Sequence, residues 1–276
     1  MNTSPKRTVF FISDRTGITA ETLGHSLLTQ FDENQFKQMT LPFVNTVDKA
    51  RTTIEYVNHA SKSSGLRAII FSTTVNEEVR SVLRQADALF MDLFDTYIET
   101  IERELNTKSA RTEGLAHGAR DEDSYKSRIE AMNYSLKHDD GESSIDYALA
   151  DVIVTAPSRC GKTPVCIYMA LQHGIFAANY PLTEDDFEKD SLPPLLLRHR
   201  EKLFGLTSSP AHLSKIRNER RPDSRYASIR QVGFELRAAE QLFQRFDVPF
   251  LSSHDKSIEE IATIIMQQKN IHRRSF

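Results

Sequence analysis

Short apolar runs alternate with segments of helical periodicity in the first half of the chain. An apolar run at residues 9–12 is followed by a helical pattern over residues 19–31, in which the leucines fall on one face. The same alternation predicts further strands at residues 41–44 and 68–71, and further helices at residues 50–60 and 76–86. Alternating strands and helices indicate an α/β layer whose sheet is largely parallel.

The apolar density falls between residues 106 and 123, where glycines and charged residues are frequent. Such a change predicts an exposed connection between domains. A helical pattern follows over residues 124–137, and it ends in the acidic turn His138-Asp139-Asp140-Gly141. We therefore divide the chain into an N-terminal α/β domain at residues 1–106, a connecting segment with this helix and turn at residues 107–145, and a second domain at residues 146–276.

The second domain opens with an apolar strand at residues 151–155, which leads into a loop and then a helix from Lys162. The last helix has a clear start, because Ser257 forms a capping box with Glu260. The patterns between them predict strand-like segments at residues 175–179, 204–207 and 248–251 and a long helix over residues 228–246. The sequence thus predicts a Rossmann-like parallel α/β domain followed by a P-loop kinase-like α/β domain.

The composition narrows the class of protein. With 35 basic and 38 acidic residues the chain has a net charge of -3, so no overall field would hold it on nucleic acid or on an anionic membrane. No apolar run reaches the length of a membrane span, and no signal peptide precedes the first strand, so we expect a cytoplasmic protein. The only cysteines, Cys160 and Cys166, exclude a disulfide framework.

A candidate phosphate-binding loop joins the strand at residues 151–155 to the following helix. A Walker A loop needs backbone amides around the phosphates, a lysine that reaches the outer phosphates, and a hydroxyl for magnesium. Lys162 and Thr163 supply the last two, and the helix dipole faces the loop. The alternative is a tight turn in which Lys162 is only solvated. The loop consists of Ala156, Pro157, Ser158, Arg159, Cys160, Gly161, Lys162 and Thr163.

Several residues of this loop depart from the minimal pattern. Ala156 stands where the pattern has glycine, which strains the loop if that position needs a positive φ and is harmless if it is extended. Pro157 removes an amide, whereas Arg159 adds a cation. Cys160 lies beside a helix N-terminus, where a thiol can have a lowered pKa, so a redox role and an ordinary small loop residue are both open.

Two further clusters could complete a phosphotransfer site. Asp139 and Asp140, next to His138, could share magnesium and base duties or form a solvated acidic turn. Residues 214–230 hold six basic side chains against two acidic ones, and they could close over phosphates as a lid because arginine matches phosphate geometry. The alternative is a solvated helix face or a nucleic-acid patch, although few aromatic side chains accompany the cations. The lid candidates are Arg217, Arg220, Arg221 and Arg225.

Six segments in order give the chain a resemblance to one family, the regulatory proteins of phosphoenolpyruvate synthase and of pyruvate, phosphate dikinase. The resemblance covers nearly the whole chain. It implies a bifunctional enzyme that switches its target off by phosphorylating a threonine with ADP, and switches it on by removing that phosphate with inorganic phosphate, releasing pyrophosphate. The segments are Ser13-Asp14 through Thr19-Ala20-Glu21, His138-Asp139-Asp140-Gly141, Ser158-Arg159-Cys160-Gly161-Lys162-Thr163-Pro164, Ala178-Asn179-Tyr180-Pro181, Lys202-Leu203-Phe204-Gly205-Leu206-Thr207 and Ser224-Arg225-Tyr226-Ala227-Ser228.

The resemblance also implies ligands, partners and roles. ADP and phosphate are the expected substrates, Mg²⁺ is the expected metal, and the phosphate loop is expected to bind ADP. Lys162 would hold the transferring phosphoryl group, and Thr163 would help bind Mg²⁺. Asp139 or Asp140 would position the threonine hydroxyl, with His138 as a further catalytic candidate. The protein partner is phosphoenolpyruvate synthase, because the acidic turn and the loop look like the synthase-regulating branch. No nucleic-acid or membrane partner is expected, and a homo-oligomer is compatible with the sequence.

Three other functions are compatible with the same residues. The same two reactions could act on pyruvate, phosphate dikinase. A non-catalytic protein could sense ADP and grip a partner through its N-terminal domain, in which case ADP would leave the mass of the partner unchanged. A small-molecule kinase of the nucleotide-kinase type would turn over ATP without any protein acceptor.

Overall fold

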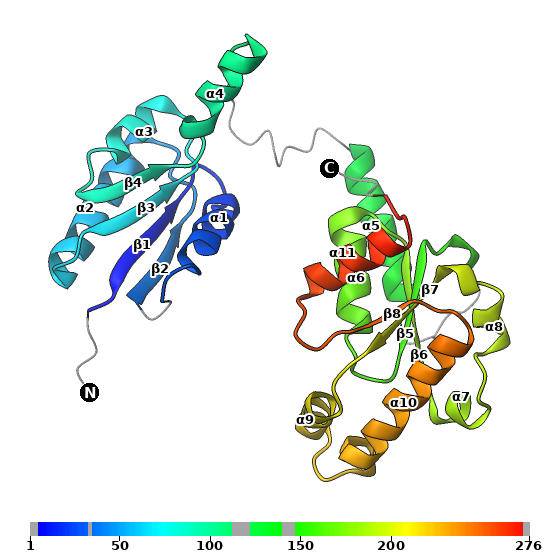
Figure 1. Cartoon of the computed structure of the whole chain (residues 1–276). Helices are drawn as coiled ribbons and strands as arrows, with labels where there is room; N and C mark the ends of the chain where they lie inside the picture. Colours follow the sequence, from blue (N-terminus) through cyan, green and yellow to red (C-terminus); the bar gives the residue numbers. More distant parts are fainter. Residues whose placement is uncertain (1–4, 33–34, 112–121, 140–146, 273–276) are drawn as a thin grey trace. The chain divides into compact units, whose positions relative to one another are not determined.

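The computed structural model describes residues 5–32, 35–111, 122–139 and 147–272. The chain divides into two compact units, Met1–Gly118 and Ala119–Phe276. Each unit contains a four-stranded parallel sheet with helices packed on it (Figure 1). The predicted α/β fold class, with two successive parallel α/β domains, is confirmed.

The sheet of the first unit has the strand order β2-β1-β3-β4. Its central strands, β1 (Arg7–Ile12) and β3 (Ala68–Ser72), are apolar and largely buried, as expected for strands covered on both faces. The edge strands, β2 (Phe36–Leu41) and β4 (Ala88–Asp92), are half-exposed and contain polar residues. The strand predicted at residues 41–44 is wrong, because β2 ends at Leu41 and the chain then turns through Phe43 with φ 59°.

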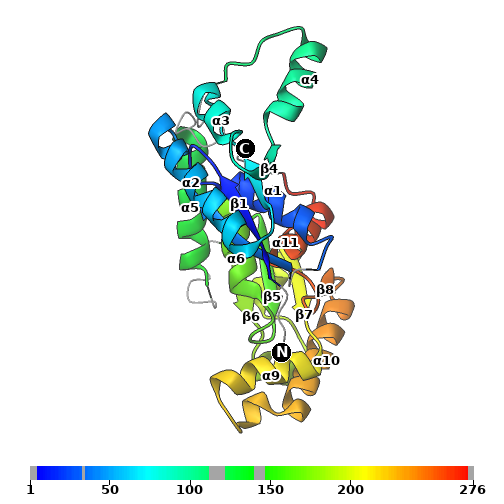
Figure 2. The ribbon, with the colours of Figure 1, turned by 90° about the vertical axis from the view of Figure 1, so that its left-hand side faces the viewer.

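Helices α1 (Ile18–Leu28), α2 (Val47–Ser64) and α3 (Glu77–Leu83) cover this sheet. Two buried apolar clusters, one on each face, include Phe10 and Ile70 on one side and Phe11 and Phe71 on the other. The fourth helix, α4 (Asp95–Leu105), contains no buried residue and projects from the unit (Figure 2). The first unit therefore has a complete core without α4.

The sheet of the second unit has the order β6-β5-β7-β8. Strand β5 (Val152–Ala156) is central and completely buried, with β6 (Ala177–Pro181) on one side and β7 (Leu203–Thr207) on the other. Strand β8 (Phe250–Ser252) forms the second edge. The candidate phosphate loop leaves the carboxyl end of β5, which is the edge where open α/β sheets bind ligands.

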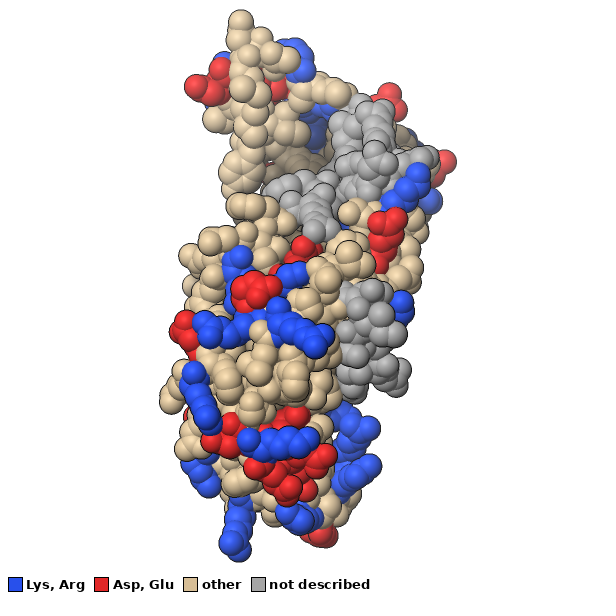
Figure 3. All heavy atoms as spheres, turned by 90° about the vertical axis from the view of Figure 1, so that its right-hand side faces the viewer, with Lys and Arg blue, Asp and Glu red and all other residues tan. Residues whose placement is uncertain are grey.

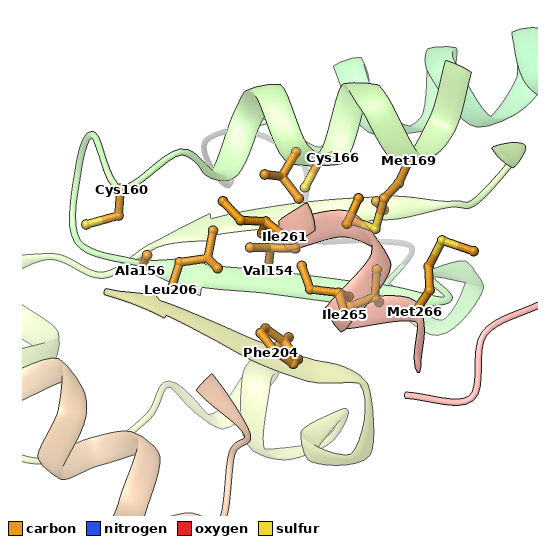
Figure 4. Packing of buried hydrophobic residues seen from close by; sticks show 14 of the residues in the cluster. Val154, Ala156, Cys160, Cys166, Met169, Phe204, Leu206, Ile261, Ile265 and Met266 are labelled. Carbon is orange, nitrogen blue, oxygen red and sulfur yellow. The ribbon is translucent and has the colours of Figure 1, made fainter. Parts of the chain in front are cut away.

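Helices surround this sheet on both faces. Figure 4 shows apolar side chains of α6, β5, β7 and α11 meeting in one core, while a second buried cluster on the other face includes Leu196, Leu242 and Phe243. The capping box predicted for Ser257 and Glu260 is present at the start of α11. The helices are α5 (Glu122–Lys137), α6 (Lys162–His173), α7 (Glu184–Glu188), α8 (Pro194–Leu197), α9 (Pro210–Arg220), α10 (Ile229–Arg245) and α11 (Ile258–Gln268). Single 3-10 turns lie at η3 (Tyr147–Leu149), η4 (Arg200–Lys202) and η5 (Arg225–Ala227).

Helix α5 packs against α6 and the end of β6. Directly after the helix, the backbone carbonyl of His138 accepts a hydrogen bond of 3.1 Å from the backbone N–H of Asn179. The helix assigned from sequence to a connecting segment therefore lies in the second unit, because its packing partners are there. This packing fixes the described end of the acidic turn beside the sheet.

The charge distribution matches the composition. Figure 3 shows basic and acidic side chains interspersed on the face that it displays, as a chain with a net charge of -3 would have. Among the described helices, none combines the length and the hydropathy that crossing a membrane requires.

Candidate functional site

The loop between β5 and α6 has a defined backbone geometry. Ala156 is the last residue of β5, where it pairs with Pro181, and it is fully buried in extended conformation. The left-handed residues of the loop are Arg159, with φ 72°, and Gly161, with φ 90°. Alanine is therefore unstrained at the position where the minimal pattern has glycine. The loop has its obligatory glycine at Gly161, directly before α6.

A cavity of about 530 Å³ opens at this loop. Lys162, largely buried, donates a hydrogen bond of 3.2 Å from Nζ to the carbonyl of Pro157, so its side chain folds back over the loop. The N-cap of α6 is Gly161, which has no side chain to cap the helix, and backbone N–H groups at a helix start are suited to bind phosphate. The cavity is lined by Asp139, Ser158, Arg159, Gly161, Lys162, Thr163, Pro164, Ile216 and Arg220. Among the described residues, the cationic side chains of Arg159, Lys162 and Arg220 and the carboxylate of Asp139 thus line the same cavity.

Thr163, Asp139 and Asn179 form a hydrogen-bonded triangle at one side of the cavity. The hydroxyl of Thr163 donates to Oδ1 of Asp139 over 2.8 Å. The amide of Asn179 donates to the same oxygen and, over 3.2 Å, to Oγ1 of Thr163. Carboxylate, hydroxyl and amide oxygens are the ligands that Mg²⁺ prefers. No cluster of three or more His, Cys, Asp or Glu side chains suited to a metal occurs within the described part of the chain.

His138 does not face the cavity. Its side chain is buried, its Nδ1 lies 2.8 Å from the carbonyl oxygen of Tyr134, and its ring stacks on the ring of Tyr134 at 4.0 Å. The residue therefore packs the end of α5 and contributes its backbone to the site, which differs from the catalytic side chain expected from sequence. Asp140 lies outside the described residues, so of the two candidate carboxylates only Asp139 is placed in the cavity wall.

Arg217 is completely buried behind the loop. Its Nε and Nη2 donate to the carbonyl of Ser158 over 3.3 and 3.0 Å, and its Nη1 donates to the carbonyl of Tyr226 over 3.1 Å. Nη2 also forms an ion pair of 2.7 Å with Glu235. These four contacts fix the guanidinium of Arg217 inside the protein, where it supports the phosphate loop through the carbonyl of Ser158. The prediction that Arg217 belongs to a lid is therefore wrong.

The other lid candidates separate into two groups. Arg220, the last residue of α9, lines the cavity, whereas Arg221 and Arg225 are not among the lining residues. The side chain of Arg225 is 79% exposed and lies 3.5 Å from Glu184. The basic stretch at residues 214–230 falls on separate elements, because α9 ends at Arg220 and the turn η5 follows. Of the four candidates, the structure brings only Arg220 together with Lys162.

Cys160 is a buried residue of the loop. Burial raises the pKa of its thiol to about 11, and this effect outweighs the lowering by Lys162 and Arg217. This direction contradicts the expected lowering of the thiol pKa, and the burial of Cys160 favours an ordinary small loop residue over a redox role. Burial also raises the pKa of Cys166, which points from α6 into the core (Figure 4).

Three site residues were missed from the sequence. Asn179 follows in the strand beside β5, and the carboxyl ends of neighbouring parallel strands share one edge, so this register could have been expected. Tyr226, whose hydroxyl lies 2.9 Å from Oγ of Ser158, lies 68 positions further along the chain. Glu235 is an acidic residue on the buried side of α10. Asn179 and Tyr226 lie in segments that carry the family resemblance, which marked the segments but not the roles of these two residues, whereas Glu235 has no local sequence signal.

The chain was compared with known proteins. The family model described as kinase/pyrophosphorylase matches residues 9–266. A protein of Alkalilimnicola ehrlichii is 52% identical over 274 residues, which cover 99% of this chain and 100% of that protein. A protein of Aromatoleum aromaticum is 51% identical over 274 residues, covering 99% of each chain. A protein of Ectopseudomonas mendocina is 49% identical over 269 residues, covering 98% of this chain and 99% of that protein. All three carry the name "Putative phosphoenolpyruvate synthase regulatory protein".

Proposed function

The chain belongs to the kinase/pyrophosphorylase family, and from that premise we propose that it regulates phosphoenolpyruvate synthase by two phosphoryl transfers. The first is an ADP-dependent phosphorylation of a threonine, which inactivates the synthase. The second removes the phosphate with inorganic phosphate and reactivates the synthase. The supporting observation is the cavity at the β5–α6 loop, where Lys162, Arg159 and Arg220 face Asp139.

In the first reaction the threonine oxygen attacks the β-phosphorus of ADP. A new bond forms between this oxygen and phosphorus, the bond to the bridging oxygen breaks, AMP leaves, and the hydroxyl proton is released. Little covalent chemistry is required of a protein in such a transfer, so positioning and charge neutralisation carry the catalysis. Lys162, Arg159 and Arg220 supply positive charge around the transferring group.

In the second reaction an oxygen of inorganic phosphate attacks the phosphorus of phosphothreonine. The bond to the threonine oxygen breaks, pyrophosphate forms, and the threonine oxygen takes up a proton. The same cations stabilise the negative charge on the transferring phosphoryl group, because this group occupies the same position in the cavity in both reactions. One cavity can therefore serve both directions.

Asp139 is the one carboxylate among the described residues that line this cavity, and we assign it to positioning the threonine hydroxyl. Its Oδ1 accepts from Thr163 over 2.8 Å and also accepts from Asn179. Oxygen ligands of this type fit Mg²⁺, which at nucleotide sites takes one or two protein oxygens together with phosphate oxygens. Thr163 and Asp139 are the residues that would hold Mg²⁺, and the ion would supply charge neutralisation for the phosphates. Asp140 stays the alternative group for orienting the threonine hydroxyl.

Three alternatives predict different outcomes. If the target is pyruvate, phosphate dikinase, incubation with ADP adds phosphate to the dikinase and leaves the synthase unchanged. If the protein only senses ADP, it binds ADP and the mass of neither enzyme changes. If it is a small-molecule kinase, it consumes ATP in the absence of any protein acceptor. Intact-mass spectrometry of both candidate targets after incubation with ADP, together with an assay of ATP consumption in the absence of both targets, separates these cases.

The residue to test is Lys162. Replacing Lys162 with Ala is expected to abolish both reactions, because each needs the cation beside the transferring group. Lys189, an exposed residue after α7, provides a matched control, and Lys189→Ala should keep both rates. Retention of either reaction at the normal rate by the Lys162→Ala protein would contradict the assignment.

A further inference from the structure

Arg217 and the carbonyl of Ser158 define the orientation of one peptide group in the phosphate loop. Two guanidinium nitrogens, Nε and Nη2, donate to that carbonyl over 3.3 and 3.0 Å. A trans peptide is planar, so its C=O and N–H point in opposite directions. When the carbonyl of Ser158 faces Arg217, the amide of Arg159 must therefore face away from Arg217.

The side opposite Arg217 is the side where phosphate would bind. Ser158 and Arg159 both line the cavity, whereas Arg217 is completely buried and does not. Arg159 adopts φ 72°, a left-handed conformation that is uncommon for residues other than glycine and that persists only when the surroundings fix it. The two hydrogen bonds from Arg217 are such a constraint.

Arg217 is itself held on every side. Its Nη2 forms the ion pair of 2.7 Å with Glu235, and its Nη1 donates to the carbonyl of Tyr226 over 3.1 Å. The guanidinium also lies 4.4 Å from the centre of the Tyr226 ring, and the hydroxyl of Tyr226 is 2.9 Å from Oγ of Ser158. The loop is thus attached to α9, η5 and α10, which pack against one another, and α9 and α10 lie side by side in both ribbon views (Figures 1 and 2).

We infer that Arg217 is a positioning residue, which turns the amide of Arg159 toward the phosphates of the nucleotide through the carbonyl of Ser158. The inference rests on the proposed function, since it assigns a role within the same ADP site. It goes beyond that function because Arg217 touches neither the cavity nor any reacting atom. Glu235 and Tyr226 act indirectly, because they hold the guanidinium of Arg217 in its orientation.

Two variants separate positioning from folding. Arg217→Lys keeps a cation for Glu235, but an ammonium has no planar fork with which to bind both carbonyls. The double variant R217M/E235L removes both charges together, and such exchanges of a buried ion pair for apolar residues are often neutral for stability. Both variants leave the carbonyl of Ser158 without its guanidinium, and neither variant substitutes a residue that lines the cavity.

The experiment measures ADP binding by calorimetry and resolves the amide of Arg159 by heteronuclear NMR. In both variants the dissociation constant for ADP is expected to rise about 10- to 100-fold, the range for one lost hydrogen bond to a charged group. At saturating ADP, kcat is expected to change much less than KM. In the unmodified protein the Arg159 amide resonance shifts on addition of ADP, and in the variants this shift is lost. The control is R245K, at the exposed ion pair of Arg245 with Asp190, which should bind ADP normally.

The outcomes distinguish the inference from the proposed function. If the unmodified protein binds no ADP, the proposed function fails. If it binds ADP and both folded variants bind ADP equally well with an unchanged Arg159 shift, the positioning role is overturned. If the variants are folded and bind ADP more weakly with loss of that shift, the role is supported. Melting temperatures and the remaining NMR resonances show whether each variant is folded.

Discussion

The hydroxyl of Thr163 donates a hydrogen bond of 2.8 Å to Asp139, a residue 24 positions earlier in the chain. This contact joins the first turn of α6 to the second residue after α5, and Asn179 of β6 donates to both partners. Three separate elements therefore meet at one point beside the phosphate loop. Asp139, the last described residue of the acidic turn, therefore attaches this turn to the phosphate loop.

Asn179 is predicted to be necessary for full activity. Asn179→Ala removes the donor shared by Asp139 and Thr163, so both oxygens lose their fixed orientation. We expect kcat/KM for phosphoryl transfer to fall about 10- to 100-fold, as for other residues that orient metal ligands. The measurement is the rate of transfer as a function of magnesium concentration. Asn58→Ala, which removes an acceptor for a backbone N–H of the first unit, is the control, and equal rates for both variants would contradict the prediction.

Glu235 is predicted to be a major contributor to stability. Glu235→Ala leaves the guanidinium of Arg217 buried without its carboxylate, which costs about 3–5 kcal/mol of unfolding free energy. Urea unfolding measures this loss. Arg245→Ala breaks the ion pair with Asp190 at the surface and is expected to cost at most about 1 kcal/mol. The prediction fails if the two variants lose similar amounts.

The two small residues at the ends of the loop, Ala156 and Gly161, are predicted to differ in how much a substitution costs and in its effect on ADP binding. Gly161→Ala places a side chain at φ 90°, with no atom close enough to clash, so the expected cost is the backbone strain of about 1–2 kcal/mol and a weaker affinity for ADP. Ala156→Gly acts within an extended strand and should cost only about 0.5–1 kcal/mol, with normal ADP binding. Thermal unfolding and calorimetry test both. A large loss of ADP affinity in Ala156→Gly would refute the geometry described for the loop.

The thiol of Cys160 is predicted to be unreactive in the folded protein. Burial raises its pKa from 9.0 to about 11, so the thiolate is scarce at neutral pH. Because the pKa is raised, the contribution of this group to stability is fully present below pH 9.0 and is lost as the pH rises toward about 11. Iodoacetamide labelling at neutral pH, followed by mass spectrometry, should modify neither cysteine until denaturant is added. Rapid labelling of native protein would contradict the described burial.

The sequence predicted the buried elements well and the exposed ones poorly. Strands β1, β3 and β5 are apolar and buried, so their composition identified them. Edge strands β2 and β4 contain exposed and polar positions, and neither was assigned correctly. The edge strands of the second unit, β6 and β8, were predicted to within two residues, so an edge position alone does not hide a strand, and it was the polar composition of β2 that hid that strand.

The candidate site shows the same division. The loop at residues 156–163 was found because strand, loop and helix are consecutive in sequence. The positions of Asn179, Tyr226 and Glu235 depend on contacts between distant segments, so they became visible only in the fold. Arg217 was assigned to a lid because it lies in a basic stretch and because the arginine fork matches phosphate geometry. Glu235 and two carbonyls make its complete burial acceptable instead.

The most direct test of the proposed function follows the β-phosphate of ADP. Phosphoenolpyruvate synthase is incubated with the protein and with ADP that carries a radioactive label in this phosphate, and the labelled residue is identified. The proposal predicts label on a threonine of the synthase with formation of AMP, followed by release of the label as pyrophosphate when phosphate is added. Label that stays in ADP, while the synthase is folded and active, would contradict it.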